Sequence, residues 1–338
     1  MSDFWRSRER TFVVAEIGSN HNRSLGLAKE LIDAAASSGA DAAKFQIYSA
    51  STLYSAKDDE RLGYDGANVT KLIEGAATPR EWLPELSDYC AARGVIFFAA
   101  PFDMAAVDEL DAVSGLFKIA SFEIVDLPLI RNTASKGKPM IIATGLANMG
   151  EIEDAVTACK ESGNSDIALL QCASCYPAPP AIMNLRSMET MRRAFGAPVG
   201  LSDHTLGIHI STAAVAMGAS IIEKHFTIDR TMKGPDHSFA IEPRELAELV
   251  REIREIESAL GNGMKTGPAA EELTAYGYAR RSIHSLVDIK KGTVITKDML
   301  ITKRPGHGIR PKYISWVAGR RAARDITSDS WITMEMLD

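Results

Sequence analysis

Short apolar runs alternate with helix-like segments along most of the chain. Each run is brief and continuously apolar, which is typical of strands buried on both faces of a parallel sheet. The segments between them repeat apolar residues every three to four positions, as amphipathic helices do. The predicted strands are 11–17, 42–48, 95–99, 116–119, 140–143, 167–171, 199–201 and 220–223. The predicted helices are 25–36, 79–93, 104–113, 128–135, 151–161, 185–195, 208–217 and 243–260.

Eight strand–helix units between residues 11 and 260 favour a closed (β/α)8 TIM barrel, an α/β fold, over an open sheet. The catalytic groups of such a barrel lie at the carboxyl ends of its strands. Turn-forming residues follow the last helix, and short β-like segments follow these. We therefore predict a barrel domain at 1–262, a linker at 263–280 and a small β-rich domain at 281–338.

Two of the predicted strand ends carry a histidine close to a carboxylate. His204 follows Asp203 at the seventh strand, and His225 lies two residues after Glu223 on the eighth. Residues two apart on a strand share a face, so Glu223 and His225 point the same way and Lys224 points the opposite way. A single such histidine would be interpreted as structural. Two of them predict a metal site with His204 and His225 as ligands, because imidazole suits Mn, Fe, Co and Zn.

Further polar residues occupy the predicted strand ends. Lys44 and Gln46 share one face of the second strand, and Lys118 lies on the fourth. A lysine inside an apolar strand is costly unless its charge is paired, so the two lysines could hold a phosphate or a carboxylate. The alternative is a purely structural pair, Lys44 with Glu16 or Lys118 with Glu123. The hydroxyl groups that could join an anion site belong to Ser121, Thr144, Ser174 and Ser202.

Composition restricts the class of protein. The chain has 338 residues, 46% hydrophobic and 24% charged, which is enough for a large barrel and a small domain. Its net charge of −6 argues against nonspecific binding to nucleic acid or to an anionic membrane. No signal-like segment and no apolar run of about 18 residues occurs, so we expect a cytoplasmic protein. Cys172 and Cys175 have CxxC spacing, which we interpret as reduced structural thiols rather than a metal or redox centre.

Several strings of residues resemble the sialic acid synthase family. They are AEIGSNHN at 15–22, GLSDHT at 200–205, IEKHFT at 222–227 and GPDH at 234–237. In the tail, YARRS at 278–282 and KRPG at 303–306 resemble the antifreeze-like (SAF) domain of that family. The resemblance implies a TIM barrel followed by a SAF domain. It also implies an enzyme that condenses phosphoenolpyruvate with an open-chain N-acylated hexosamine to a nonulosonic acid, using a divalent metal ion, Mn²⁺ or Mg²⁺.

The same resemblance implies roles for individual residues. His204 and His225 correspond to metal ligands, and Glu16 and Glu223 correspond to residues at the reacting centre. The positions that match phosphoenolpyruvate-binding residues are Lys44, Lys118, Ser121, Ser174 and Ser202. The positions that match sugar-binding residues are Gln46, Glu123, Tyr176 and Asp236 in the barrel and Arg304 in the SAF domain, where the arginine holds the N-acyl group.

Two features of the resemblance concern the substrates. Ala143 and Ala173 stand where many relatives have a serine and a threonine, so the resemblance leaves open whether one hydroxyl contact to phosphate is kept. The strings ASFEIVD at 120–126 and RPGHG at 304–308 are closer to the pseudaminic acid synthase branch than to the N-acetylneuraminate branch. A pseudaminate-type product is therefore slightly favoured.

Three alternative functions remain open. A Schiff-base aldolase would use Lys44 or Lys118 as its nucleophile. A metal hydrolase would use the two histidines. A noncatalytic carbohydrate binder would use the tail and would leave the polar strand ends unexplained.

The connector 261–280 is long enough to reach a neighbouring barrel, so we expect a two-fold dimer in which Arg304 of each tail caps the partner's site.

Overall fold

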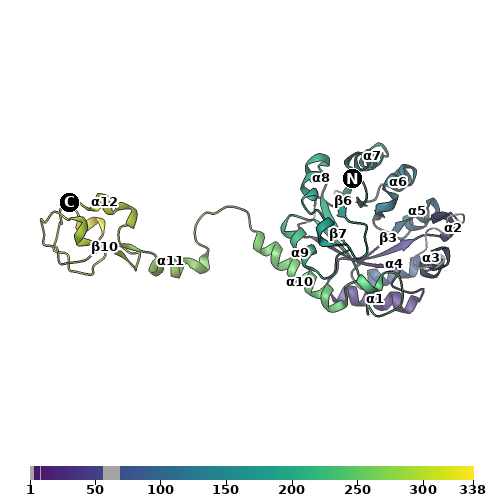
Figure 1. The fold of residues 1–338 in the computed structure, drawn as a ribbon, viewed down its shortest axis with the longest axis horizontal. Helices are drawn as coiled ribbons and strands as arrows, with labels where there is room; N and C mark the ends of the chain where they lie inside the picture. The colour runs from purple at the N-terminus through teal and green to yellow at the C-terminus, as the bar shows by residue number, and fades with distance from the viewer. Residues whose placement is uncertain (1–3, 8, 56–68) are drawn as a thin grey trace. The chain divides into compact units, whose positions relative to one another are not determined.

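A computed structural model of the chain describes residues 4–7, 9–55 and 69–338 (Figure 1). It contains two compact units, Met1–Gly261 and Asn262–Asp338. The first unit is a closed barrel in which eight strands pair in sequence order. All the pairings are parallel, and β1 (Phe12–Gly18) closes the barrel against β8 (Ile221–His225). The predicted (β/α)8 fold is confirmed.

The other strands of the barrel are β2 (Ala42–Ile47), β3 (Ile96–Pro101), β4 (Phe117–Ile119), β5 (Met140–Ala143), β6 (Ile167–Cys172) and β7 (Val199–Asp203). The helices that follow the eight strands form the outer layer seen in Figure 1. They are α1 (Leu25–Ser37), α4 (Leu83–Ala92), α5 (Met104–Asp111), α6 (Leu127–Ser135), α7 (Met149–Glu161), α8 (Ser187–Phe195), α9 (His209–Ala216) and α10 (Pro243–Leu260).

The structure differs from the predicted elements in two ways that affect the site. Two short helices, α2 (Ala50–Leu53) and α3 (Val69–Ala76), lie between β2 and α4, where no helix was predicted. Strands β7 and β8 each continue two residues beyond their predicted ends, to Asp203 and His225. The apolar pattern stops earlier because the final residues of both strands are polar, although all of them are buried.

Several of the outer helices begin at a polar residue soon after a strand. The side chain of Asp103 accepts a hydrogen bond from the backbone N–H of Ala106 at the start of α5. Asn148 and Glu151 form a capping box at the start of α7. Such side chains satisfy backbone N–H groups that have no partner within the helix. They fix where each helix starts beside the carboxyl end of the barrel.

The barrel has two apolar layers. The larger lies between strands and helices and includes Leu31, Phe45 and Leu249. The smaller is a cluster of strand side chains that includes Phe12, Phe98 and Leu170 together with Trp5. Trp5 is 4% exposed and its ring lies 5.6 Å from that of Phe12, so the N-terminal segment packs against the base of β1. Polar chemistry is thereby confined to the opposite ends of the strands.

The second unit is small and has its own apolar core. It contains α11 (Leu273–Ala279), an antiparallel pair of strands, β9 (Ser282–Ser285) and β10 (Leu300–Lys303), and α12 (Ile314–Val317). Isolated bridges such as His284 to Trp331 add further β pairing. The core includes Ile283, Ile295 and Val317. The unit therefore has fewer regular strands than the β-rich pattern suggested, and loops carry much of the chain.

Among the described residues, no helix combines the length and the apolar character needed to cross a bilayer.

Candidate active site

The carboxyl ends of the strands bring two lysines and two glutamates together inside the barrel. Lys44 Nζ lies 2.9 Å from Oε2 of Glu16 and 3.6 Å from Oε1 of Glu223. Lys118 Nζ donates to both carboxylate oxygens of Glu223, at 2.7 and 2.8 Å. All four side chains are nearly inaccessible to solvent. We call this alternating set of Glu16, Lys44, Glu223 and Lys118 the charge row.

One prediction about these pairs is confirmed and one is wrong. Lys44 pairs with Glu16, as the structural alternative suggested. Lys118 pairs with Glu223 and not with Glu123. Glu123 lies in a 3-10 turn after β4, whereas Lys118 and Glu223 come from strands on opposite parts of the closed barrel. Closure of the barrel brings the latter two together, and their separation in sequence gives no sign of it.

The charge row shifts the pKa values of its members in different directions. Burial raises the pKa of Glu16, and the charge of Lys44 only partly offsets this effect. Burial would also raise the pKa of Glu223, but the ammonium groups of Lys118 and Lys44 lower it to about 2. Burial lowers the pKa of Lys118. Glu223 is thus held ionised, while Glu16 is the more readily protonated carboxylate.

The two predicted metal ligands lie side by side at the ends of β7 and β8. The ring centroids of His204 and His225 are 5.3 Å apart. Nδ1 of His204 lies 2.9 Å from the carbonyl oxygen of Ala173, so an N–H there leaves Nε2 as the basic nitrogen. Nδ1 of His225 is buried without a hydrogen-bond partner, and Oδ2 of Asp236 is 3.7 Å away. Burial and the charge of His204 hold the pKa of His225 well below its usual value.

These features fit a divalent metal ion. Neutral imidazole is the form that binds metal, and a hydrogen bond from the other ring nitrogen to a carbonyl fixes the ring, as in many metal sites. An unpartnered buried nitrogen is also rare unless a ligand completes it. Within the described residues no group of three or more His, Cys, Asp and Glu side chains is arranged to hold an ion. His204 and His225 would therefore need further ligands from substrate or water.

An aromatic wall stands beside the two histidines. The ring of Tyr176, which is 41% exposed, lies 4.2 Å from that of His204. The buried ring of Phe239 lies 5.0 Å from that of His225 and 5.4 Å from that of Tyr176. Tyr176 was predicted from the sequence as a site residue, whereas Phe239 was not. The position of Phe239, two residues after the GPDH string, was the available signal.

Two of the four predicted hydroxyl groups, those of Ser121 and Ser174, flank a small space at the ends of β4, β5 and β6. Oγ of Ser121 accepts a hydrogen bond from the backbone N–H of Gly145 at 3.2 Å. Oγ of Ser174 is buried without a hydrogen-bond partner. A Cβ atom at Gly145 would lie 2.3 Å from Ser174 Oγ and 2.7 Å from Ser121 Oγ. Glycine therefore keeps the space between the hydroxyl groups open. Oγ of Ser202 instead donates to Glu223 Oε1 at 3.0 Å.

Cys172 lies closer to the site than a purely structural thiol would. Its Sγ is 3.7 Å from Nδ1 of His204 and receives a weak hydrogen bond from Ser121 at 3.5 Å. All four cysteines are free, as expected. The residue thus packs directly behind a predicted metal ligand.

The other predicted sugar-side residues form a second edge next to Glu16. Nε2 of Gln46 donates to Glu16 Oε1 at 2.6 Å. Burial and the nearby Glu16 raise the pKa of Asp236 to about 6. Gly18, with φ +52°, lies between them, and a Cβ there would come within 3.1–3.3 Å of all three side chains. A glycine at this bulge in β1 therefore allows the close approach of Glu16, Gln46 and Asp236.

Two predicted residues lie apart from this cluster. Glu123 is at the rim, where burial raises its pKa to about 7 and its Oε2 lacks a hydrogen-bond partner. Arg304 belongs to the second unit and is exposed in the loop after β10. The hydroxyl of Thr144 does not join the site either, because it donates to the carbonyl oxygen of Leu170 and contacts Met191 of α8. The other predicted residues come together at the carboxyl ends of the barrel strands.

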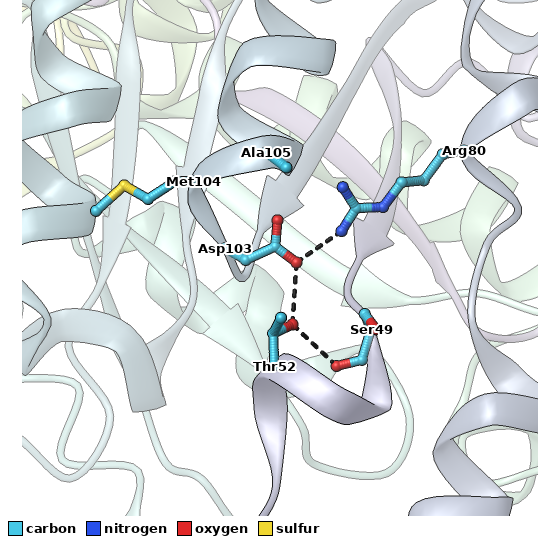
Figure 2. A pocket seen from close by; sticks show the side chains of 6 residues that line it. All are labelled: Ser49, Thr52, Arg80, Asp103, Met104 and Ala105. Carbon is cyan, nitrogen blue, oxygen red and sulfur yellow. Dashed lines mark hydrogen bonds and ion pairs between the residues drawn. The ribbon is translucent and has the colours of Figure 1, made fainter.

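A separate hollow of about 520 Å³ lies between the connections that follow β2 and β3 (Figure 2). Arg80 is paired there with Asp103, at 2.6 Å, and with Glu109, at 3.2 Å. Oγ1 of Thr52 also donates to Asp103. The charges of this hollow satisfy one another, and none of the predicted site residues lines it.

Fold and site together define a (β/α)8 barrel with buried charged groups and two neighbouring histidines at the carboxyl ends of its strands. Residues 31–265 match the NeuB family, and residues 280–338 match the SAF domain. The chain belongs to the NeuB family. It is an enzyme of this family, and the noncatalytic alternative is set aside.

Individual relatives support the same assignment. The chain is 40% identical to the N,N'-diacetyllegionaminic acid synthase of Legionella pneumophila, over 97% of this chain and 94% of that protein. It is 35% identical to the pseudaminic acid synthase of Helicobacter pylori, over 96% and 97%. A crystal structure of the N-acetylneuraminic acid synthetase from Leptospira borgpetersenii is similar, with a TM-score of 0.71 and 37% identity over 79% of this chain and 90% of that one. The resemblance to sialic acid synthases is thus confirmed at the level of nonulosonic acid synthases.

Proposed function

We propose that this enzyme condenses phosphoenolpyruvate with the open-chain form of an N-acylated hexosamine, giving a nonulosonic acid and inorganic phosphate. The observation that carries the proposal is the buried charge row beside His204 and His225. Two buried lysines suit a small polyanion. Two imidazoles suit a divalent transition-metal ion such as Mn²⁺, and Mg²⁺, which prefers oxygen ligands, is the alternative. Such an ion, when bound, acts as a Lewis acid that polarises an aldehyde oxygen.

Phosphoenolpyruvate is assigned to the side of the site formed by β2, β4, β5 and β6. Lys44 and Lys118 supply positive charge for its phosphate and carboxylate. The unpartnered hydroxyl of Ser174, with Ser121 across the space at Gly145, supplies hydrogen bonds. Ser202, which now binds Glu223, lies at the border of this region. Holding both anionic groups fixes the double bond in a geometry suited to attack.

The sugar is assigned to the opposite side, next to the aromatic wall. Gln46 and Asp236 offer polar groups beside Glu16, and Tyr176 offers a ring face for the carbon chain. Glu123 at the rim and Arg304 of the SAF domain are assigned to the distal groups of the sugar. We assign the N-acyl group to Arg304, because a guanidinium is a strong donor to a carbonyl oxygen.

The two glutamates have different roles, since Glu16 transfers protons and Glu223 stabilises positive charge. The double-bond electrons of phosphoenolpyruvate form a bond from C3 to the aldehyde carbon, and the aldehyde oxygen takes a proton from Glu16, the carboxylate with the raised pKa, to become a hydroxyl. Positive charge then develops at C2, where the ionised Glu223 stabilises it. Water adds at C2 and gives one proton to the now ionised Glu16. The C2–O bond to phosphate then breaks as the C2 hydroxyl gives its proton to the departing phosphate, leaving a ketone and inorganic phosphate.

The type of product is proposed from the relatives. The motifs at 120–126 and 304–308 slightly favoured the pseudaminate type. The identity to a legionaminate synthase, 40%, exceeds that to a pseudaminate synthase, 35%. We therefore propose a legionaminate-type product and treat the pseudaminate type as the alternative.

The test is phosphate release from phosphoenolpyruvate across a panel of N-acylated sugars, with Mn²⁺, with Mg²⁺ and with a chelator. We expect turnover only with a sugar and a divalent ion together, and fastest with the legionaminate precursor. Full activity under chelation would contradict the metal-dependent reaction. Because burial lowers the pKa of Lys118, a Schiff-base aldolase is the second candidate. Covalent trapping of pyruvate on the protein by borohydride would support that candidate and overturn the first.

The assembly and the compartment are proposed on the same basis. We propose a homodimer in which the SAF domain of each chain caps the barrel of its partner. The exposure of Arg304 is compatible with binding to another surface. We also propose that the enzyme works in the cytoplasm, where free thiols such as its four cysteines persist.

A further inference from the structure

The helix-facing side of β7 and β8 buries a second ion pair that takes no part in the proposed chemistry. Asp203 and Lys224 are direct neighbours in the register of the two strands. Each immediately precedes one of the two histidines in the sequence. Lys224 Nζ lies 3.0 Å from Oδ2 of Asp203, and the two residues are only 2% and 1% exposed.

The ammonium group of Lys224 also binds the backbone on both sides of His204. Its Nζ donates to the carbonyl oxygen of Thr205 at 2.7 Å and to that of Asp203 at 3.4 Å. The backbone between these two carbonyls sets the direction of the His204 ring. Lys224 itself is the residue between Glu223 and His225. One side chain therefore ties together the two strand ends that carry the histidines.

Asp203 uses both of its oxygens to hold the same segment. Oδ1 accepts hydrogen bonds from the backbone N–H and the hydroxyl of Thr205, at 2.9 and 2.8 Å. Oδ2 accepts one from the hydroxyl of Ser211, at 2.6 Å, in the first turns of α9. Ser211 is fully buried. We call Asp203, Thr205, Ser211 and Lys224 the β7–β8 clamp.

Stability alone is a weak reason for such a clamp. Removing two charges from water costs several kcal/mol for each ion, and replacing a buried pair by apolar residues is often neutral or stabilising. A fully bonded polar network instead specifies one arrangement of the groups attached to it. Here the attached groups are His204 and His225, whose ring centroids lie 5.3 Å apart.

We propose that the β7–β8 clamp positions His204 relative to His225 and so sets the affinity of the site for a divalent metal ion. This inference rests on the proposed metal site. The clamp residues are positioning residues, since they act through the backbone of residues 203–205 and through β8. Supporting groups behind metal ligands commonly change metal affinity or activity by roughly 10- to 100-fold when they are lost.

The test uses the full-length chain carrying Asp203→Asn together with Lys224→Met, which removes both charges and leaves no unpaired ion. Two quantities are measured on chelator-treated protein. They are the melting temperature and the Kd for Mn²⁺, which is obtained from the EPR signal of free Mn²⁺. We expect a folded protein whose Kd is roughly 10- to 100-fold higher than that of the wild type. Arg254→Met is the matched control. It removes the ion pairs of Arg254 to Glu257 in α10 and to Asp41 just before β2, and should leave the Kd unchanged.

Metal-free protein provides a second readout that does not depend on the proposed function. Histidine ring resonances in ¹H–¹⁵N NMR spectra are assigned with His204→Ala and His225→Ala. We expect the His204 signals to shift or broaden in the double variant and not in Arg254→Met. A wild type without His204-dependent Mn²⁺ binding would refute the proposed metal site, and the clamp would then be judged on these spectra.

A folded double variant with the wild-type Kd and unchanged His204 signals would overturn the clamp. If the double variant does not fold, Ser211→Ala takes its place, because it removes one hydrogen bond and no charge. The same two measurements then decide, with smaller expected changes in the same direction.

Discussion

Strands β7 and β8 bury charged side chains on both of their faces, yet the two faces are built differently. On the barrel side, Glu223 accepts hydrogen bonds from Lys118 and Ser202, while Nδ1 of the neighbouring His225 has no hydrogen-bond partner. On the helix side, Asp203 and Lys224 have their polar atoms bonded to each other and to nearby groups. The same two strands thus carry one incomplete polar cluster and one complete cluster.

The difference shows how to distinguish residues that bind ligands from residues that hold other side chains in position. A buried polar atom without a partner costs about 1–3 kcal/mol, so native proteins keep few of them. At the carboxyl ends of the barrel strands, His225 Nδ1 and Ser174 Oγ lack hydrogen-bond partners, and so does Glu123 Oε2 at the rim. The inner face is thus poised to gain bonds from ligands. The outer face has little to gain, and its value lies in holding its neighbours in place.

The largest expected effect is the loss of an inner-face imidazole. His204→Ala or His225→Ala should reduce kcat by roughly 10³-fold, because Lewis-acid stabilisation of a transition state is worth several kcal/mol. Folding should be preserved, since the β7–β8 clamp is untouched. Steady-state phosphate release and circular dichroism check both statements. Near-wild-type turnover of either variant without added metal would show that the imidazoles hold no catalytic ion.

Removal of a lysine from the charge row should have the next largest effect. Lys118→Met is expected to raise the KM for phosphoenolpyruvate by roughly 10- to 100-fold, because a hydrogen bond to a charged group is worth about 1.5–3 kcal/mol. The KM for the sugar should change much less. Kinetics with each substrate varied in turn give the two values. An effect confined to the sugar would assign Lys118 to the other side of the site.

The exposed arginine of the SAF domain should matter less than the charge row. Arg304→Ala should raise the KM for the sugar by about tenfold, as for one charged hydrogen bond near solvent. Mixing this variant with His204→Ala tests the proposed dimer, after subunits exchange. If Arg304 acts on the partner's barrel, one site of each mixed dimer is intact, and a fraction of the activity regains the wild-type KM for the sugar. If mixed dimers form and all the activity keeps the raised KM, the arginine does not act across the dimer.

The smallest effect concerns the rim. Because burial raises the pKa of Glu123 to about 7, the folded chain binds a proton that the unfolded chain releases above about pH 4.5. Stability should therefore fall as pH rises through this window, and Glu123→Gln should remove that part of the pH dependence. Melting temperatures of both proteins between pH 4.5 and 8 provide the test. The variant should gain on the order of a few degrees at the upper end, and a constant difference across the range would contradict the raised pKa.

Much of the fold followed from local patterns, because each barrel strand is a short apolar run whatever its neighbours are. The alternation along β8 also placed Glu223 and His225 on one face and Lys224 on the other, and this is confirmed. The partner of Lys118 could not be predicted, because it lies 105 residues away and is set by closure of the barrel. Phe239 was missed for a related reason, since its ring meets His225 only after the chain folds back beyond β8.

The partners of Lys224 were equally hidden from the sequence. Its direction followed from the strand period, but its bonds to Asp203 and Thr205 depend on the register between β7 and β8. The polar ends of both strands also shortened the predicted elements by two residues. The sequence pattern identifies the polar residues at the ends of β7 and β8 as unusual for apolar strands. Only the pairing of the strands shows which groups these residues contact.

The charge row also links substrate binding to proton uptake. With two lysines and two glutamates, its formal charge is zero before any substrate arrives. An entering polyanion adds negative charge next to Glu16, whose pKa burial already raises, and makes its protonation easier still. Binding of the anion and uptake of a proton then form one linked equilibrium. The apparent affinity for the anion should accordingly strengthen as pH falls toward the pKa of Glu16, so the enzyme would draw a proton from solvent together with its anionic substrate.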